Sequence, residues 1–385
     1  NNIEERTAGY IMTEINIGSN IMLEPGVRYE FMHTDYTSNY VVENAFATDG
    51  LEAGYPIAIN VDDRDNEHFF PSINSKFQVN DWIVVRAAYY KSASRPDYRL
   101  LSPGLISDNL RDNITAYNPY LRPAIAHNYD IGVTLYDNEI GFFTVNGFYK
   151  EITDLIYRLP RYQPSRFEVV TGAPDALIES LEKPRELYPG DLYTNVTEMS
   201  NFPINNPNKA FFSGFEINWQ TNLWYLPGLL NGLVLDLNYT WIKSETKFPY
   251  LLIEQVGVSP GFPPVPIYEV SYQTKDSRML DQPKHIFNAR IGWDYKGFSS
   301  RLSFRYQGET VRSLDPVLNI QDSFIEDELR IDFTAKQKIT ENLSFIIDLS
   351  NISEVIEDAK LEKNSLIQSS EFYGFTSQFG VRYEL

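Results

Sequence analysis

The sequence predicts an all-β protein whose antiparallel strands form a transmembrane barrel, and three observations support this fold class. Apolar and polar residues alternate along many short segments, which is the period of a β-strand. The connections between these segments are short and long in turn. No continuous apolar stretch reaches about 18 residues, so the sequence predicts no membrane-spanning helix.

Composition narrows the class of protein. The chain has 385 residues, no cysteine and a formal charge of −19. This length suits one large barrel or a few soluble domains. The absence of cysteine excludes disulfides and thiolate metal sites. The acidity disfavours nucleic acid as a partner, because phosphate contacts need clustered Lys and Arg.

The final segment, YGFTSQFGVRYEL, shows the alternation most clearly, and only Ser377 interrupts its apolar parity. The apolar side is made by Tyr373, Phe375, Phe379, Val381, Tyr383 and Leu385. Similar alternation elsewhere gives a total of thirteen predicted strands. At the N-terminal end they are expected near Tyr10–Ile17, Met22–His33, Phe70–Val79 and Trp82–Lys91. Helical periodicity is not convincing anywhere in the chain.

The two sides of these segments differ in a way that suits a bilayer. The polar side carries charges such as Arg290, Asp294 and Arg301, whereas Trp and Tyr occur towards the ends of the apolar side. A strand of about ten residues, tilted by about 45°, crosses a bilayer core. Hydrocarbon offers the backbone no hydrogen-bond partner, so the sheet must close on itself. We therefore expect the apolar side to face lipid and the polar side to face a lumen.

The connections give a second signal. Tight joints are predicted at Gly18–Asn20, Asn80–Asp81, Asp137–Gly141, Tyr295–Gly297 and Thr340–Asn342, and the joint around Leu226–Gly232 is slightly longer. Long connections alternate with them at 34–69, 92–123, 156–208, 246–284, 308–327 and 354–370. Outer-membrane barrels have short periplasmic turns and long extracellular loops. Bacterial barrels of one chain have even strand numbers, so thirteen strands predict part of a larger barrel.

Several segments resemble the TonB-dependent outer-membrane receptors, particularly their Bacteroidetes-type branch. The segment containing Ser94, Arg95, Pro96 and Asp97 is similar to that family's strand–turn–strand, and the resemblance covers roughly residues 65–385. The Asn-Pro-x-Leu-x-Pro segment is matched by Asn118, Pro119, Leu121 and Pro123. The family has barrels of about 22 strands with a plugged lumen. The resemblance thus implies that residues 1–385 are the C-terminal portion of a single barrel domain, with the plug domain and early strands outside this chain.

The resemblance also implies a function: TonB-dependent active transport of a ligand across the Gram-negative outer membrane. This chain would supply barrel wall and ligand-capturing outer loops. The implied partners are the TonB complex, through an N-terminal segment outside the chain, the outer-membrane lipids, the barrel assembly machinery and a surface lipoprotein. The machinery recognises a terminal strand that usually ends in Phe or Trp, from which Leu385 departs. No cofactor, nucleic acid or enzymatic reaction is implied, and the identity of the ligand is left open.

Two alternatives fit the same patterns. One is a passive porin or another outer-membrane barrel, and the other is a secreted soluble β-rich adhesin. No Gly-x-Ser-x-Gly nucleophile motif occurs, which disfavours a hydrolase.

The predicted loop 156–208 is rich in aromatic and basic residues that could contact a ligand. Tyrosine offers flat contact area at a low entropic cost, and arginine suits anionic groups. The candidates are Tyr157, Arg158, Arg161, Tyr162, Arg166, Tyr188 and Tyr193. The alternative is a loop whose aromatic rings bury one another.

The acidic segment VDDRDNEH is a weaker candidate, for a cation site. Its oxygen ligands, which calcium prefers, would be Asp62, Asp63, Asp65 and Glu67. It lacks the glycine of an EF-hand loop, and a solvated loop tip is the alternative.

Overall fold

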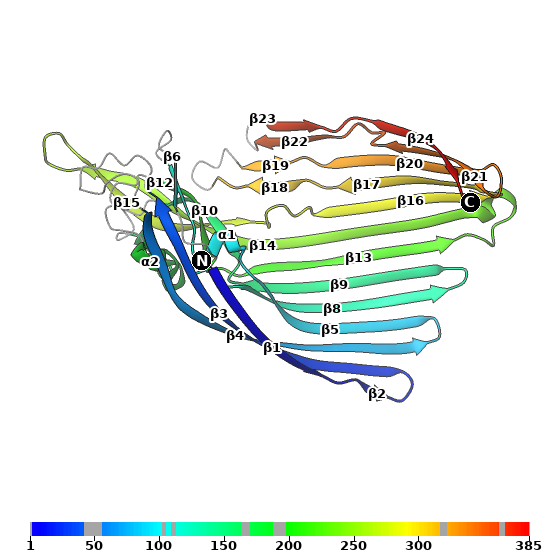
Figure 1. Ribbon diagram of the computed structural model, residues 1–385, viewed down its shortest axis with the longest axis horizontal. Coiled ribbons are helices and arrows are strands. Elements are labelled where there is room, and N and C mark those ends of the chain that lie inside the picture. Colours follow the sequence, from blue (N-terminus) through cyan, green and yellow to red (C-terminus); the bar gives the residue numbers. More distant parts are fainter. Residues whose placement is uncertain are drawn as a thin grey trace.

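A computed structural model describes residues 2–41, 56–101, 105–108, 113–162, 170–187, 198–315, 322–361 and 366–384. Its main feature is one antiparallel sheet that curves into an open wall (Figure 1). Along the main path of this sheet, each strand pairs with the path strands that come before and after it in the sequence, as in a barrel wall built of hairpins. Thirteen strands form the path, which confirms the predicted count.

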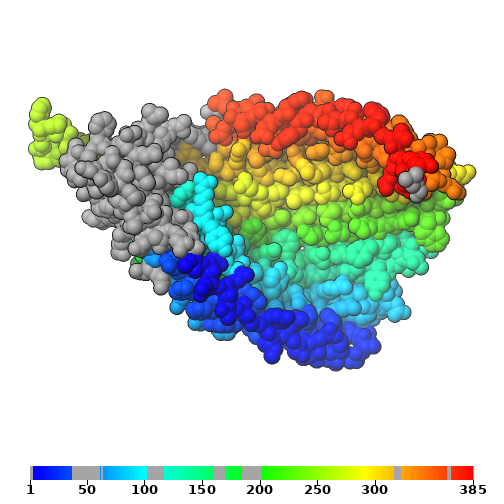
Figure 2. Space-filling model, in the orientation of Figure 1, coloured from blue at the N-terminus to red at the C-terminus, as the bar shows by residue number. Residues whose placement is uncertain are grey.

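The wall strands, in spatial order, are β1 (Asn2–Met12), β3 (Ile21–Val41), β4 (Pro56–Asn80), β5 (Ile83–Ser94), β8 (Ala124–Asp137), β9 (Gly141–Thr153), β13 (Ala210–Asn222), β14 (Leu233–Val258), β16 (His285–Tyr295), β17 (Phe298–Gln307), β20 (Glu328–Lys338), β21 (Leu343–Ser350) and β24 (Thr376–Tyr383). Three further strands join the same sheet: β2 (Ile15–Ile17), β11 (Val170–Thr171) and β15 (Pro266–Ser277). Figure 2 shows the chain order across one face, from the first strands in blue to the last in red.

Two small sheets lie outside the wall. One contains β6 (Leu105–Asp108), β7 (Asn113–Ala116), β10 (Ile156–Tyr162) and β12 (Glu198–Asn205). The other contains β18 (Thr310–Ser313), β19 (Ser323–Ile325), β22 (Ile356–Leu361) and β23 (Ile367–Phe372). The helical elements within the described ranges are α1 (Tyr98–Leu101), α2 (Asp175–Leu187) and a 3₁₀ turn, η2 (Gly228–Gly232). No helix in the described part of the chain is long and apolar enough to span a membrane.

Short turns gather at one end of the wall and long connections at the other, as the sequence predicts (Figure 1). A two-residue turn joins β16 to β17, where Tyr295 pairs with Phe298. The two residues between them, Lys296 and Gly297, have φ of 46° and 81°. Positive φ at both central positions suits a two-residue hairpin, because the twist of such a turn matches that of its strands.

The register separates the two faces of the wall. One row of paired residues crosses ten neighbouring strands and is apolar or aromatic throughout: Ile21, Phe77, Val85, Val133, Val145, Ile217, Tyr239, Phe287, Tyr306 and Leu329. The adjacent row is mostly polar: Met22, Lys76, Arg86, Gly132, Asn146, Glu216, Thr240, Ile286, Gln307 and Glu328. Successive residues point to opposite faces, so one face of the whole wall is apolar.

Aromatic residues border this apolar face at two levels. Towards the long connections, the rings of Tyr89 and Tyr149 lie 5.1 and 6.1 Å from that of Tyr129 between them. Towards the short turns, the Trp219 indole donates to the Ile140 carbonyl at 2.9 Å. Two aromatic girdles around an apolar band about 25 Å tall are typical of a transmembrane barrel.

Several strands extend beyond the predicted limits. The predicted connection 34–69 is wrong in part, because β3 continues to Val41 and β4 starts at Pro56. The two strands remain paired through this extension, across a bulge between Thr34 and Tyr36. Connections 156–208 and 246–284 likewise contain β10, β12, α2, β15 and the outer half of β14. These parts lie beyond the girdle, where backbone pairing continues but apolar alternation is no longer required.

The helix α2 is a further correction. Its sequence, DALIESLEKPREL, spaces Leu177 and Leu181 four residues apart, so both fall on one face. Pro184 lies inside its span and obscures the helical pattern. The terminal strand is also shorter than predicted. It starts at Thr376, and Gly374, with φ of 65°, turns the chain before it.

Of the residues predicted for the terminal strand, Phe379, Val381 and Tyr383 lie in β24. Tyr373 and Phe375 precede it, and Leu385 lies outside the described residues. Phe379 pairs with Ile347 and Val381 with Phe345 on the apolar face, whereas Gln378 pairs with Asp348 on the polar face.

We expect Phe379→Arg to impair insertion of the full-length protein into the outer membrane. An arginine on the lipid face costs about 2–4 kcal/mol near the midplane, whereas the lumen can solvate it. Gln378→Arg is the matched control and should insert normally. The measurement is the amount of heat-modifiable, protease-resistant protein in outer-membrane fractions. Equal loss in both variants would contradict the assignment of the faces.

Candidate functional site

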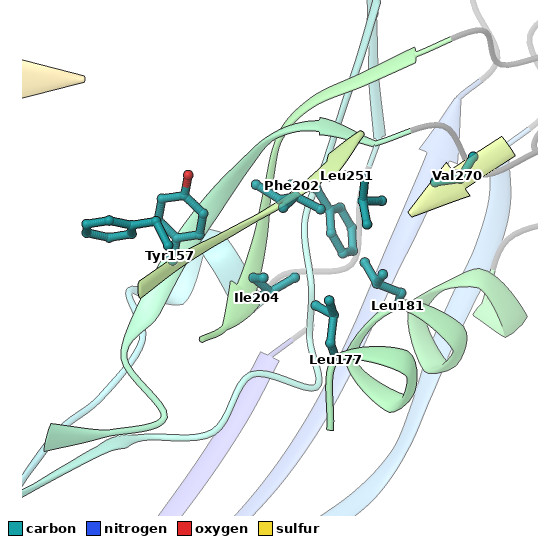
Figure 3. Packing of buried hydrophobic residues seen from close by; sticks show 9 residues of the cluster. Tyr157, Leu177, Leu181, Phe202, Ile204, Leu251 and Val270 are labelled. Atoms are coloured by element: carbon teal, nitrogen blue, oxygen red, sulfur yellow. The ribbon is translucent and has the colours of Figure 1, made fainter. Parts of the chain in front are cut away.

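The long connections form a packed layer at one end of the wall. In this outer layer, β10 pairs with β12, and α2 packs beneath them against the extended part of β14 and against β15 (Figure 3). The shared core contains Tyr157, Leu159, Leu177, Leu181, Phe202, Ile204, Phe248, Leu251 and Val270. A cluster of this kind fixes the layer, because side chains from several connections exclude water together.

Tyr157, a predicted ligand contact, belongs to this core. It is 8% exposed, and its ring lies 4.9 Å from that of Phe248. Burial raises the pKa of its hydroxyl well above the ordinary value. These observations favour the alternative of rings that bury one another at this position. Arg158, the next residue of β10, is exposed on the opposite side of the strand and stays a predicted ligand contact.

The other candidates of this segment are less fully described. The backbone of Arg161 and Tyr162 belongs to β10, opposite Ser200 and Met199 of β12. Arg166, Tyr188 and Tyr193 lie outside the described residues.

Three buried asparagines, whose joint role no sequence pattern indicates, tie the outer layer to the wall. The Asn118 amide donates to the Pro203 carbonyl at 3.0 Å, and its oxygen accepts from the Tyr120 N–H at 2.9 Å. The Asn206 amide donates to the Lys247 carbonyl at 3.0 Å. The bonds to the carbonyls of Pro203 and Lys247 join segments far apart in the sequence.

Asn205 forms hydrogen bonds with backbone groups of two other segments. Its amide donates to the carbonyls of Arg122 and Asp154, both at 2.9 Å. Its side-chain oxygen accepts from the Arg122 N–H at 2.9 Å. The Arg122 guanidinium in turn donates to the Asp154 carboxylate at 2.7 Å. Backbone groups at the junction of three connections are thereby satisfied away from water.

The predicted cation loop is wrong as a loop. Asp62, Asp63, Asp65 and Glu67 all lie within β4, because the outer part of that strand is paired with β3. The Asp65 carboxylate lies 2.8 Å from Nδ1 of His33. Among the residues that the structure describes, no group of three or more His, Asp and Glu could hold a metal ion.

A second candidate site is a hollow of about 660 Å³ on the polar face of the wall. Its lining includes three basic groups, on Lys76, Arg86 and Lys150, and two acidic groups, on Asp130 and Glu216. These residues come from β4, β5, β8, β9 and β13, and the sheet register aligns them on one face. The charged part of the lining suits polar or zwitterionic groups, whereas Phe148, Phe212 and Ile242 add apolar surface.

The antiparallel wall, its apolar face between two girdles and its turn asymmetry define an outer-membrane β-barrel protein of Gram-negative type. The family model described as "TonB dependent receptor-like, beta-barrel" matches residues 1–352. The chain therefore belongs to this family of TonB-dependent receptor barrels. No curated protein sequence gives a significant match.

Solved structures of similar fold are transport receptors. The ferric-catecholate import receptor Fiu of E. coli K12, in its closed form, superposes with a TM-score of 0.64 at 16% identity, over 100% of this chain and 45% of Fiu. The ferric yersiniabactin uptake receptor FyuA of Yersinia pestis superposes with a TM-score of 0.58 at 13% identity, over 99% of this chain and 46% of FyuA. A double mutant of the Serratia marcescens hemophore receptor HasR, in complex with its hemophore HasA and heme, superposes with a TM-score of 0.56 at 13% identity, over 99% of this chain and 51% of HasR. The chain thus spans about half the length of these receptors.

We expect Asn205→Ala to loosen the outer layer. Two carbonyls and one N–H lose their partner, at a cost of about 1–3 kcal/mol for each buried group left unsatisfied. The measurement is hydrogen–deuterium exchange of the full-length protein, in which the amides of β10 and β12 should exchange faster while those of β16 and β17 do not change.

Asn16→Ala is the control, because Asn16 is exposed and its amide donates only to Glu14 at 2.7 Å in the described hydrogen bonds. If the amides of β10 and β12 exchange as slowly in Asn205→Ala as in the wild type, the hydrogen bonds of Asn205 do not hold the outer layer in place.

Proposed function

We propose that this chain supplies wall and outer surface to a transporter that imports a ligand through the outer membrane with energy delivered by TonB. The family match over residues 1–352 carries the proposal. The ordered outer layer supports capture of a ligand from outside, and the polar hollow of the inner face supports its passage. No bond of the ligand is made or broken.

We infer that the complete barrel contains more strands than this chain. The described sheet ends at β1 and at β24, each of which has one unpaired edge. Unpaired backbone groups are not stable in hydrocarbon, so additional strands must cover both edges. Both edge strands run towards the short-turn end, which requires an odd number of additional strands between them (Figure 1). On this proposal the chain is the C-terminal portion of a barrel of about 22 strands that surrounds a plug domain.

The ligand is proposed to meet the outer layer first. Exposed groups there include Arg158, whose neighbours Tyr157 and Leu159 are held in the core. A rigid strand therefore presents the guanidinium to solvent. The Ser94–Asp97 and Asn118–Pro123 segments support a place in the Bacteroidetes-type branch, and a surface lipoprotein as an additional partner, by resemblance alone.

The passive porin and the soluble adhesin are separated from this proposal by one experiment. Full-length protein is purified in detergent and inserted into planar lipid bilayers. We expect insertion without a large steady conductance, because a plug closes the lumen at rest. A stable open-channel current would identify a passive porin. Protein that stays monodisperse without detergent and does not enter bilayers would identify a soluble protein.

Energy coupling is tested by binding. We expect the full-length protein to bind the purified periplasmic domain of TonB, and a version that lacks its first segment before the plug not to bind it. Equal retention of both proteins, or of neither, by immobilised TonB would contradict the coupling.

A further inference from the structure

A small cavity lies where the two segments that carry the family resemblance meet. Its volume is about 100 Å³, and it lies against the polar face of β3 and β4. Arg95 and Pro96 of the first segment line it, as do Pro119, Leu121 and Pro123 of the second. Segments that are separate in the sequence therefore build one partly open site at the outer end of the wall.

Two polar atoms of the cavity lining lack a partner. Within the described part of the chain, the buried Tyr36 hydroxyl and the buried Arg95 Nε make no hydrogen bond. Tyr36 is 3% exposed, and its ring packs in a cluster with Val61, Leu100 and Leu121. Buried polar groups without partners are rare and need an explanation. An arginine Nε–H can only donate, so this site requires an acceptor.

The charges around the cavity favour an anionic acceptor. Glu30 forms ion pairs with Arg28 and with Arg95. The Arg64 guanidinium donates to the Pro119 carbonyl at 2.8 Å and lies 5.4 Å from the centre of the Tyr120 ring. No ion pair joins Arg64 to a carboxylate among the described residues. Of the charged side chains that line the cavity, those of Arg64 and Arg95 are basic and that of Glu4 is acidic, which leaves one positive charge.

We propose that this cavity is a binding subsite for a carboxylate group of a captured ligand, with the Tyr36 hydroxyl and Arg95 Nε as donors and Arg64 as the compensating charge. A cavity of this size has room for a group of a few heavy atoms, since about 10–15 Å³ of accessible volume is enough for one water. This inference rests on the proposed capture function only for the source of the carboxylate.

The protonation state of Tyr36 agrees with a donor role. Burial raises the pKa of its hydroxyl to about 12. The phenol therefore stays neutral and able to donate at any physiological pH, and an ionised phenolate does not compete with the anion. The Tyr36 ring is fixed by its cluster, so the donor is in position before a ligand arrives.

The test uses full-length protein in detergent and acetate as the probe, with neutral acetamide as the isosteric control. Calorimetric titration should show saturable binding of acetate and none of acetamide. In Tyr36→Phe and in Arg95→Lys, which removes the Nε–H but keeps the charge, affinity for acetate should fall about tenfold or more, because a charge-assisted hydrogen bond is lost. Tyr225→Phe, the same chemical change at a distant turn, should bind as the wild type does.

A second measurement, thermal unfolding, shows whether the variant folds as the wild type does. Tyr36→Phe removes an unpartnered hydroxyl and keeps the packed ring, so without acetate its thermal unfolding should match that of the wild type. Acetate should raise the melting temperature of the wild type more than that of the variant. No binding of acetate to the wild type, or undiminished binding to Tyr36→Phe, would overturn the subsite. Neither result depends on TonB, so failure of the subsite and failure of the transport proposal are distinguishable.

Discussion

The constraint on which the rest of this structure depends is that hydrocarbon cannot satisfy a backbone hydrogen bond. Each wall strand other than the two at the edges is paired on both sides, and the polar and apolar rows follow from that pairing. The row from Ile21 to Leu329 stays apolar across ten strands because each member faces the same solvent. The adjacent row is free to carry Lys76, Arg86 and Glu216, since it faces a lumen that water or protein can fill.

Beyond the membrane the same strands meet a different requirement. There the chain builds a folded layer from long connections, and a core of its own replaces lipid as the apolar environment. Buried amides take over the role that sheet pairing has in the wall: Asn118, Asn205 and Asn206 each satisfy a carbonyl of a distant segment. This organisation keeps exposed groups such as Arg158 on rigid supports. It also forms part of the lining of the small cavity, through Pro119, Leu121 and Pro123.

The sequence predicted most of the wall and little of the outer layer, for a physical reason. Between two solvents a strand must alternate, so the faces of the segments around Ile291, Leu302 and Phe333 could be assigned from parity. Outside the bilayer that requirement ends. The extension of β3 to Val41 and the helix α2, with Pro184 inside it, therefore left no clear pattern. Parity also could not distinguish Tyr157 in a core from an exposed tyrosine, because its partners Phe248 and Leu177 come from other segments.

The central claim, that one face of the wall touches lipid, is tested most directly with spin labels, because the chain has no cysteine of its own. Ile291→Cys and Arg290→Cys, adjacent positions on opposite faces of β16, are labelled in full-length protein reconstituted in lipid vesicles. The label at 291 should be accessible to oxygen, which partitions into hydrocarbon, and protected from a water-soluble nickel chelate. The label at 290 should be less accessible to oxygen. Equal collision rates at the two positions, or the reverse pattern, would contradict the account.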